Sequence, residues 1–271
     1  MQIPLLSICT VGCKADEVIM ENGDKKSIDL FGIKPFADSL KIGTQALVDG
    51  ASAFLGRICL PAAEEFGLTL KDKIHNYREV NKVMMLQKAK QKLNKFSSEE
   101  GKQANPRLVG AILNHGSWVN NKEIQDMWAG LLASACTEDG QDDSNLIFIN
   151  ILSQITRLQA SVLNYACENV EKKLSEAGFI ASKNALIIKL QDLMKIADCD
   201  NFHRLDRELD HLRSLGLIGY AMHSGGFSQY NTDADITPTG FAIQMYVRCQ
   251  GYIGSPDEYF GIKKDKLSEE S

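Results

Sequence analysis

The strongest pattern of hydrophobic and polar positions lies between Leu108 and Leu163. Apolar residues recur there at three- and four-residue spacing, which places them on one helix face: Ile124, Trp128, Leu131, Leu132 and Ala135. Asn120, followed by Glu123, predicts a capping box at the start of this helix. Small residues from Ala129 to Ser134 predict a closely packed neighbouring helix. A second apolar stripe predicts the partner helix of a helix hairpin: Leu146, Ile149, Leu152 and Ile155.

The region before this hairpin divides into a leader and helical segments. Residues 1–35 mix short apolar runs with a polar patch and predict a variable N-terminal leader. Residues 36–66 predict a mostly apolar helix, with Pro61 starting a fresh turn and Gly67 as C-terminal cap. Asp49 and Arg57 interrupt it before the run reaches the roughly eighteen apolar residues that a membrane span requires.

A long basic helix is predicted from Leu70 to Phe96, and a polar linker follows over residues 97–106. Together with the hairpin and a helix from Gln159 to Leu174, these segments predict a helical domain over residues 36–176. The basic helix is typical of a solvated face, and contact with nucleic acid through Lys88 and Lys92 is the alternative.

The pattern changes after residue 176, where short helices, strands and turn residues alternate. We predict helices over 185–197 and 201–215, the second with Gly216 just after its end. A β-hairpin follows, built from strands 217–222 and 227–236, and a closing helix has Pro238 at its first position. This order is that of a winged helix-turn-helix. The sequence therefore predicts a mainly α fold whose winged-helix domain covers residues 177–251, followed by a flexible tail, 252–271.

Composition narrows the class of protein. The chain has 271 residues, a net charge of −5 and a charged fraction of 24%, which are ordinary for a globular protein and argue against coating of nucleic acid by bulk charge. Its seven cysteines have no disulfide or zinc-finger spacing, and several fall on apolar helix faces. We therefore expect reduced thiols, no cofactor and a cytoplasmic location.

The second helix of the predicted winged helix carries the candidate nucleic-acid contacts. Six side chains there can reach phosphates or base edges: Asn201, His203, Arg204, Arg207, His211 and Arg213. Carboxylates on the same helix repel phosphate, and the segment from Gly219 to Ile236 has no Lys or Arg. Because phosphate contacts supply most of the affinity for DNA, this charge balance favours a packing or protein-interaction module.

No group of residues predicts catalysis or metal binding. Asp198, Cys199 and Asp200 precede His203 and His211, but their spacing matches no familiar ligand set. The acidic loop from Glu138 to Asp143 lacks the ligand alternation of a calcium loop and predicts a solvated connection. His115 is interpreted as a capping or packing residue. The sequence contains no phosphate-binding glycine loop and no nucleophile elbow, so we expect no enzymatic activity.

Two features together resemble the abortive infection alpha (Abi-alpha) family of bacterial proteins, which is associated with phage defence. They are the tract from Gly116 to Ala133 and the closing winged helix, and the segment from Leu60 to Leu68 is also similar. The resemblance covers roughly residues 40 to 245. Its signature residues mark a fold and supply no catalytic group: Trp118, Glu123, Trp128, Leu131 and Leu132.

The resemblance leads to three hypotheses of function. The first is a non-enzymatic component of phage defence that acts through contacts with a partner protein or with itself. The second is a regulator or sensor that binds DNA or RNA through the basic helix and helix 201–215. The third is a membrane-active effector that exposes the apolar stretch 40–66. We favour the first, because the sequence offers no reaction chemistry and no strongly basic wing.

Overall fold

A computed structural model describes residues 34–59, 77–219 and 233–262, with only the backbone for 34–45. The chain divides into two compact units, Met1–Gly43 and Thr44–Ser271. Of the first unit, the helical backbone of residues 34–43 is described, and all other described residues belong to the second. The rest of the predicted leader, and the predicted caps Pro61 and Gly67, lie outside the described residues.

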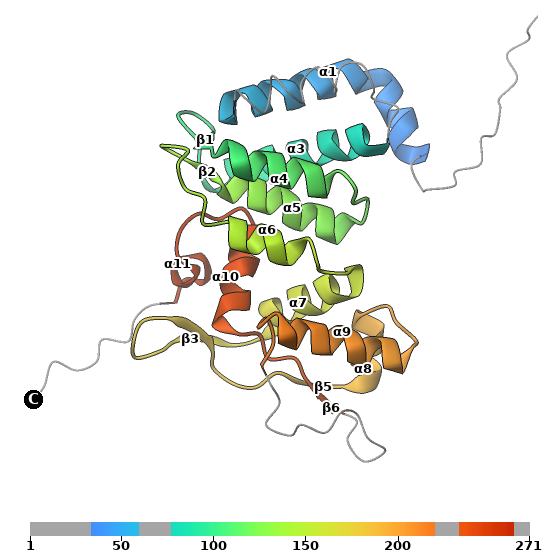
Figure 1. Ribbon diagram of the computed structural model, residues 1–271, viewed down its shortest axis with the longest axis vertical. Coiled ribbons are helices and arrows are strands. Elements are labelled where there is room, and N and C mark those ends of the chain that lie inside the picture. The colour runs from blue at the N-terminus through green and yellow to red at the C-terminus, as the bar shows by residue number, and fades with distance from the viewer. Residues whose placement is uncertain (1–33, 60–76, 220–232, 263–271) are drawn as a thin grey trace, which may run out of the picture. The chain divides into compact units, whose positions relative to one another are not determined.

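The N-terminal part of the second unit contains α1 from residue 44 onward, three further helices and a short antiparallel strand pair (Figure 1). They are α1 (Lys34–Ile58), α3 (Tyr77–Phe96), α4 (Pro106–Gly116), α5 (Lys122–Ser134), β1 (Gln103–Ala104) and β2 (Cys136–Thr137). The predicted linker 97–106 therefore includes a strand, because β1 pairs antiparallel with β2. Asn105 caps α4 by accepting a hydrogen bond from the Arg107 N–H, and Pro106 occupies the first turn, where a missing N–H does no harm.

Helix α5 lies at the centre of the core and packs against α3, α4, α6, α7 and α10. Its predicted apolar face is confirmed, since all five of its members are buried: Ile124, Trp128, Leu131, Leu132 and Ala135. Gly130 allows the closest approach, because a Cβ there would lie 1.6 Å from the carbonyl oxygen of Cys249 on α10. The predicted close neighbour of the small residues is therefore α10.

The predicted capping box at the start of α5 is wrong by one residue. Asn121 is the cap, and its Oδ1 accepts hydrogen bonds from the N–H groups of Glu123 and Ile124. Glu123 is then the second residue of the helix. A capping box requires the side chain of the third residue to accept the backbone N–H of the cap, so Glu123 does not form one.

The partner in the predicted helix hairpin is two helices, α6 (Leu146–Leu152) and α7 (Arg157–Asn169), and both pack against α5. A capping box between Thr156 and Gln159 starts α7. This local signal divides the apolar stripe, so that Ile155 is buried in the connection and not in a helix. The predicted helix to Leu174 also ends early, because residues 172–174 form a strand.

The part after α7 contains two small antiparallel pairs and two helices. Its elements are β3 (Lys172–Leu174), β4 (Ile180–Ser182), β5 (Ile187–Lys189), α8 (Leu190–Ile196), α9 (Phe202–Ser214) and β6 (Asp233–Asp235). Helix α9 is confirmed with its leucine seam, and Gly216 has the positive φ, 69°, expected just beyond the end of the helix. The predicted helix from residue 185 is wrong at its start, because β5 precedes α8.

The sequence predicts that residues 227–236 pair with residues 217–222, but strand β6 pairs with β5. Residues 217–219 instead face 237–239, through a bridge between Ile218 and Pro238 and a hydrogen bond from the Gly219 N–H to the Thr237 carbonyl. The turn of the predicted hairpin, residues 224–226, lies outside the described residues. Those that are described form a mainly helical fold with small antiparallel hairpins.

The last described elements are α10 (Gly240–Cys249) and α11 (Pro256–Phe260). Thr239, and not Pro238, precedes α10, because its hydroxyl accepts the Ala242 N–H while Pro238 lies in the bridge to Ile218. The predicted flexible tail is wrong for residues 252–262. Helix α11 is held by its own aromatic rings. The Phe96 and Tyr259 ring centroids are 6.0 Å apart, and Lys172 Nζ lies 4.3 Å from the centre of the Phe260 ring.

Candidate functional site: the turn between α4 and α5

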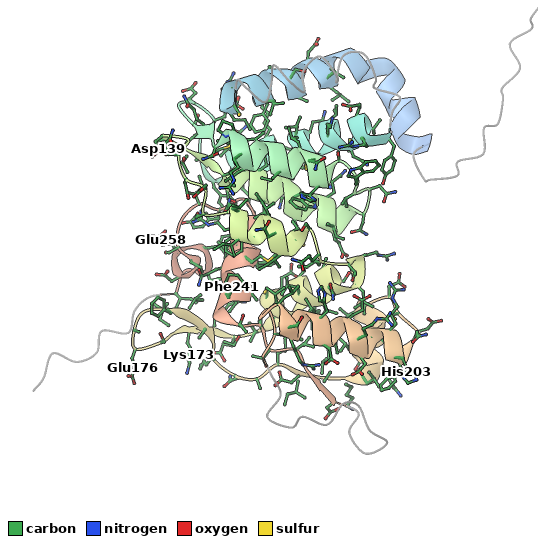
Figure 2. All side chains as sticks on the ribbon, viewed as in Figure 1. Asp139, Lys173, Glu176, His203, Phe241 and Glu258 are labelled. Carbon is green, nitrogen blue, oxygen red and sulfur yellow. The ribbon has the colours of Figure 1, made fainter. Side chains whose placement is uncertain are left out.

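The predicted nucleic-acid residues on α9 are interleaved with carboxylates. Three of them are exposed: His203, Arg204 and Arg207. Figure 2 shows His203 projecting from α9 near the start of the helix. Arg204 Nε lies 3.6 Å from Glu208 Oε1, and Arg213 Nη1 lies 2.8 Å from Asp210 Oδ1. Arg207 makes no ion pair with the described part of the chain, so one of three arginines here presents an uncompensated charge.

The predicted contacts on the basic helix hold α3 against its neighbours. Lys92 Nζ lies 2.8 Å from Asp126 Oδ2 of α5 and 3.3 Å from Gln250 Oε1. Lys88 Nζ is 4.0 Å from Asp126 and donates to the carbonyl of Lys122 at 3.4 Å. Helices α3 and α9 lie in opposite halves of the unit, with α5, α6 and α7 between them (Figure 1). The fold therefore does not bring the two predicted groups together.

Behind α9 lies a buried polar network that the sequence reasoning missed. Gln159 of α7 accepts from the Thr156 N–H, and its amide nitrogen lies 2.9 Å from the Glu208 carbonyl and 2.9 Å from His211 Nδ1. Because the Gln159 amide is the donor, His211 Nδ1 is the acceptor. Thr156 also donates to the Glu208 carboxylate at 2.7 Å. These groups attach α9 to α7, and the spacing of Thr156 and Gln159 was the available signal.

The turn at residues 117–121, here named the tryptophan turn, presents a large apolar side chain to solvent. Trp118 is 61% exposed. Arg78 of α3 places its guanidinium carbon 4.3 Å from the centre of the indole ring, which is a cation–π contact. The Tyr77 hydroxyl donates to the Trp118 carbonyl at 3.2 Å. The exposed ring is therefore held in one place by residues that lie about forty positions earlier in the chain.

The base of the tryptophan turn is fixed by buried groups. Ser117 is fully buried, and its carbonyl accepts from Asn81 Nδ2 at 3.0 Å. Arg78 Nε donates to the Ser117 hydroxyl at 3.1 Å. A side chain at Gly116 would force Met85 to move, because a Cβ would lie 2.5 Å from Met85 sulfur and 3.3 Å from the Trp128 ring. A rigid support under an exposed aromatic ring is typical of a surface built for contact.

The signature residues thus have different environments. Trp128, Leu131 and Leu132 are at most 1% exposed, and the exposed Glu123 accepts the Ser161 hydroxyl of α7. His115 is confirmed as a packing residue, because its ring stacks on Trp128 with centroids 5.8 Å apart. No local sequence signal marks the residues that support the tryptophan turn: Tyr77, Arg78 and Asn81. They contact residues about forty positions later in the chain, and a contact over that distance leaves no periodicity in the sequence.

The remaining candidate groups make ion pairs or hydrogen bonds within the protein. Asp198 lies 2.7 Å from Arg157, and the Cys199 thiol donates to the Asn201 carbonyl. In the acidic loop, hydrogen bonds from the Gln141 N–H and the Thr137 hydroxyl lower the pKa of Asp139. Within the described ranges, no three His, Cys, Asp or Glu side chains are grouped as a metal site would require. Four of the described cysteines are buried: Cys59, Cys136, Cys167 and Cys249.

Comparison with known proteins gives one positive result. The sequence profile of the abortive infection alpha family matches residues 80–239, which is more than half of the 271 residues. The chain belongs to that family. The matched range includes the tryptophan turn, α5 and α9, but not the segment from Leu60 to Leu68. No curated protein and no solved structure shows a significant match.

The predicted membrane-active stretch, residues 40–66, is described as far as Cys59 and forms part of α1. None of the described helices is both long enough and apolar enough to cross a membrane.

Proposed function

We propose that this chain is a non-enzymatic component of abortive-infection defence that acts through protein contacts made by the tryptophan turn. The abortive infection alpha family supplies the setting. The observation that carries the proposal is Trp118, which is 61% exposed and is nevertheless held rigidly by α3. Tryptophan, tyrosine and arginine are the residues that most often dominate binding energy at protein interfaces, and all three meet at this turn.

The test is protection of bacterial cells against phage. Truncating a central aromatic anchor weakens binding by about thirtyfold, so Trp118→Ala should abolish or sharply reduce protection in a plaque assay. Phe179→Ala is the matched control, because Phe179 is a comparably exposed aromatic residue, 70% exposed, on the hairpin of β3 and β4. Protection by Trp118→Ala equal to that of the unmodified chain, at equal protein level, would overturn the proposal.

The proposal also assigns a winged helix-turn-helix to residues 177–251 and interprets it as a packing and interaction module. Its support is the order β5, α8, α9, the bridged segment 217–219 and β6, together with the pairing of β5 and β6. The buried network that joins α9 to α7, and the carboxylates among its arginines, argue for packing over DNA reading.

Fluorescence anisotropy with labelled duplex DNA and single-stranded RNA tests this second part. We expect no saturable binding even at low salt, where electrostatic attraction is least screened. Saturable binding that weakens steeply with salt, and that Arg204→Ala with Arg207→Ala removes, would establish the nucleic-acid-binding regulator instead.

A further inference from the structure

The two ends of α5 differ in charge. At its N-terminal end, Lys88, Lys92 and Lys122 lie near two carboxylates. Asp126 pairs with the first two lysines, and the exposed Glu123 accepts the Ser161 hydroxyl. Arg78, stacked on Trp118, adds a further positive charge. Burial lowers the pKa of Lys88, and the charges of Lys122 and Lys92 lower it further while that of Asp126 raises it. This end, with the tryptophan turn beside it, thus combines an exposed aromatic ring with an excess of positive charge among the described residues.

The C-terminal end of α5 leads into the acidic loop, residues 138–143, and Figure 2 labels Asp139 there. Glu138 has a side chain 90% exposed, and Asp143 is also exposed. Their cationic neighbours, Lys102 at 3.6 Å and Arg107 at 3.7 Å, form solvent-facing pairs, which are weak. Asp139 and Asp142 accept hydrogen bonds from the backbone N–H groups of Gln141 and Ser144, and Arg248 lies near enough to Asp142 for the two charges to interact. The four carboxylates of the loop still outnumber their three cationic neighbours, Lys102, Arg107 and Arg248.

These two surfaces cannot meet within one molecule. Helix α5 has thirteen residues and so separates them by roughly 20 Å. Figure 1 shows the turn between α4 and α5 at one end of the helix and the loop with β2 at the other. The ends are rigid, since α5 is buried among five neighbouring helices. Their complementarity can be satisfied only between molecules.

We infer that the tryptophan turn of one copy binds the acidic loop of a second copy, so that the chain associates head to tail. This inference rests on the proposed function, because it names the partner of the same turn. The indole packs on the loop, and Lys122 faces the Glu138 and Asp143 carboxylates. A contact between different surfaces of identical chains leaves one free surface at each end, and it therefore extends to a ring or a filament.

Sedimentation velocity of the full chain tests the inference with two double variants. The head variant carries Trp118→Ala and Lys122→Glu, and the tail variant carries Glu138→Lys and Asp143→Lys. The unmodified chain should form species larger than dimers as its concentration rises, with association weakened about tenfold by salt that screens charge. Each variant alone should remain a monomer, whereas an equimolar mixture should form dimers that do not grow further.

The mixture also controls for folding, because each variant supplies the intact surface that the other lacks. Phe179→Ala should assemble like the unmodified chain. An unmodified chain that stays monomeric at every concentration, variants that assemble alone, or a mixture that remains monomeric would each overturn head-to-tail association. If the chain is monomeric and Trp118→Ala still abolishes protection, self-association fails and the proposed function stands. If the chain assembles and Trp118→Ala still protects, the proposed function fails.

Discussion

The two tryptophans of this chain are ten residues apart and occupy opposite environments. Trp128 is 1% exposed on the inner face of α5, where it packs under His115 and against Gly116. Trp118 is 61% exposed on the turn before the same helix. Both belong to one sequence signature, yet the first contributes to the core and the second offers a contact surface. Membership of a motif therefore does not tell which residues support stability and which are available to a partner.

The largest effect should come from removing the buried ring. Trp128→Ala leaves a cavity at the centre of the core and should lower the free energy of unfolding by about 4 kcal/mol. Trp118→Ala removes one exposed cation–π contact and should lower it by less than about 1 kcal/mol. Urea unfolding followed by circular dichroism measures both. Equal losses would mean that the two tryptophans do not differ as described.

The next effect concerns the backbone contact on the inner face of α5. Gly130→Ala should lower the free energy of unfolding by about 3 kcal/mol, because the new Cβ would overlap the Cys249 carbonyl and force α5 and α10 apart. Gly110→Ala in α4 is the control, since nothing lies within 4 Å of its Cβ position. It should stabilise the protein by about 0.5 kcal/mol through helix propensity. Thermal unfolding that ranks the two variants in the reverse order would refute the close contact.

A smaller effect separates the two asparagines of the tryptophan turn. Asn121→Ala removes the cap of α5 and should lower the free energy of unfolding by about 1 kcal/mol. Asn120→Ala should change it by less than about 0.5 kcal/mol, because Asn120 is exposed and is not the cap. Chemical unfolding of both variants checks the assignment, which a larger loss for Asn120→Ala would reverse.

The last effect is no larger than the loss of the cap, depends on pH and concerns α10, the helix that covers the inner face of α5. Burial, helped by the charge of Glu168, raises the pKa of Tyr246 on α10. Tyr246→Phe removes the hydroxyl that donates to Glu168 at 3.2 Å and should lower the free energy of unfolding by about 1 kcal/mol at neutral pH. Above about pH 10 the unfolded tyrosine ionises and the folded one does not, so the unmodified chain loses stability and the difference narrows. Unfolding at neutral and alkaline pH should show this convergence, and a constant difference would contradict it.

The parts of the fold that the sequence predicted are those specified by local signals. The apolar spacing on α5 and the leucine seam of α9 were sufficient for both helices, and Gly216 marked the end of α9. The errors arose where tertiary pairing overrides a local pattern. The apolar residues at the start of 187–189 are compatible with a helix. They form a strand because they pair with β6, which lies more than forty residues later in the chain. Pro238 is also compatible with a first helical turn, but its β-bridge to Ile218 places it before α10.

The candidate site was only half predictable. Trp118 was singled out as part of a signature, but its exposure depends on Tyr77 and Arg78, whose contacts cross about forty positions. The sequence predicts Lys88 and Lys92 on a solvated face, because nothing local reveals Asp126 as their partner. In both cases the deciding contact lies between elements that only the assembled core brings together.

The close approach of α10 to α5 has a consequence for how the protein is made. The carbonyl of Cys249 covers Gly130, so the inner face of α5 stays open until a helix more than one hundred residues later has been synthesised. Helices α3, α4 and α5 leave the ribosome first, and their apolar surface stays exposed until α10 follows. Chains with such exposed surface are prone to aggregation and proteolysis. Folding to a stable core is therefore a late step of translation, and a chain released before α10 is complete lacks the segment that closes it.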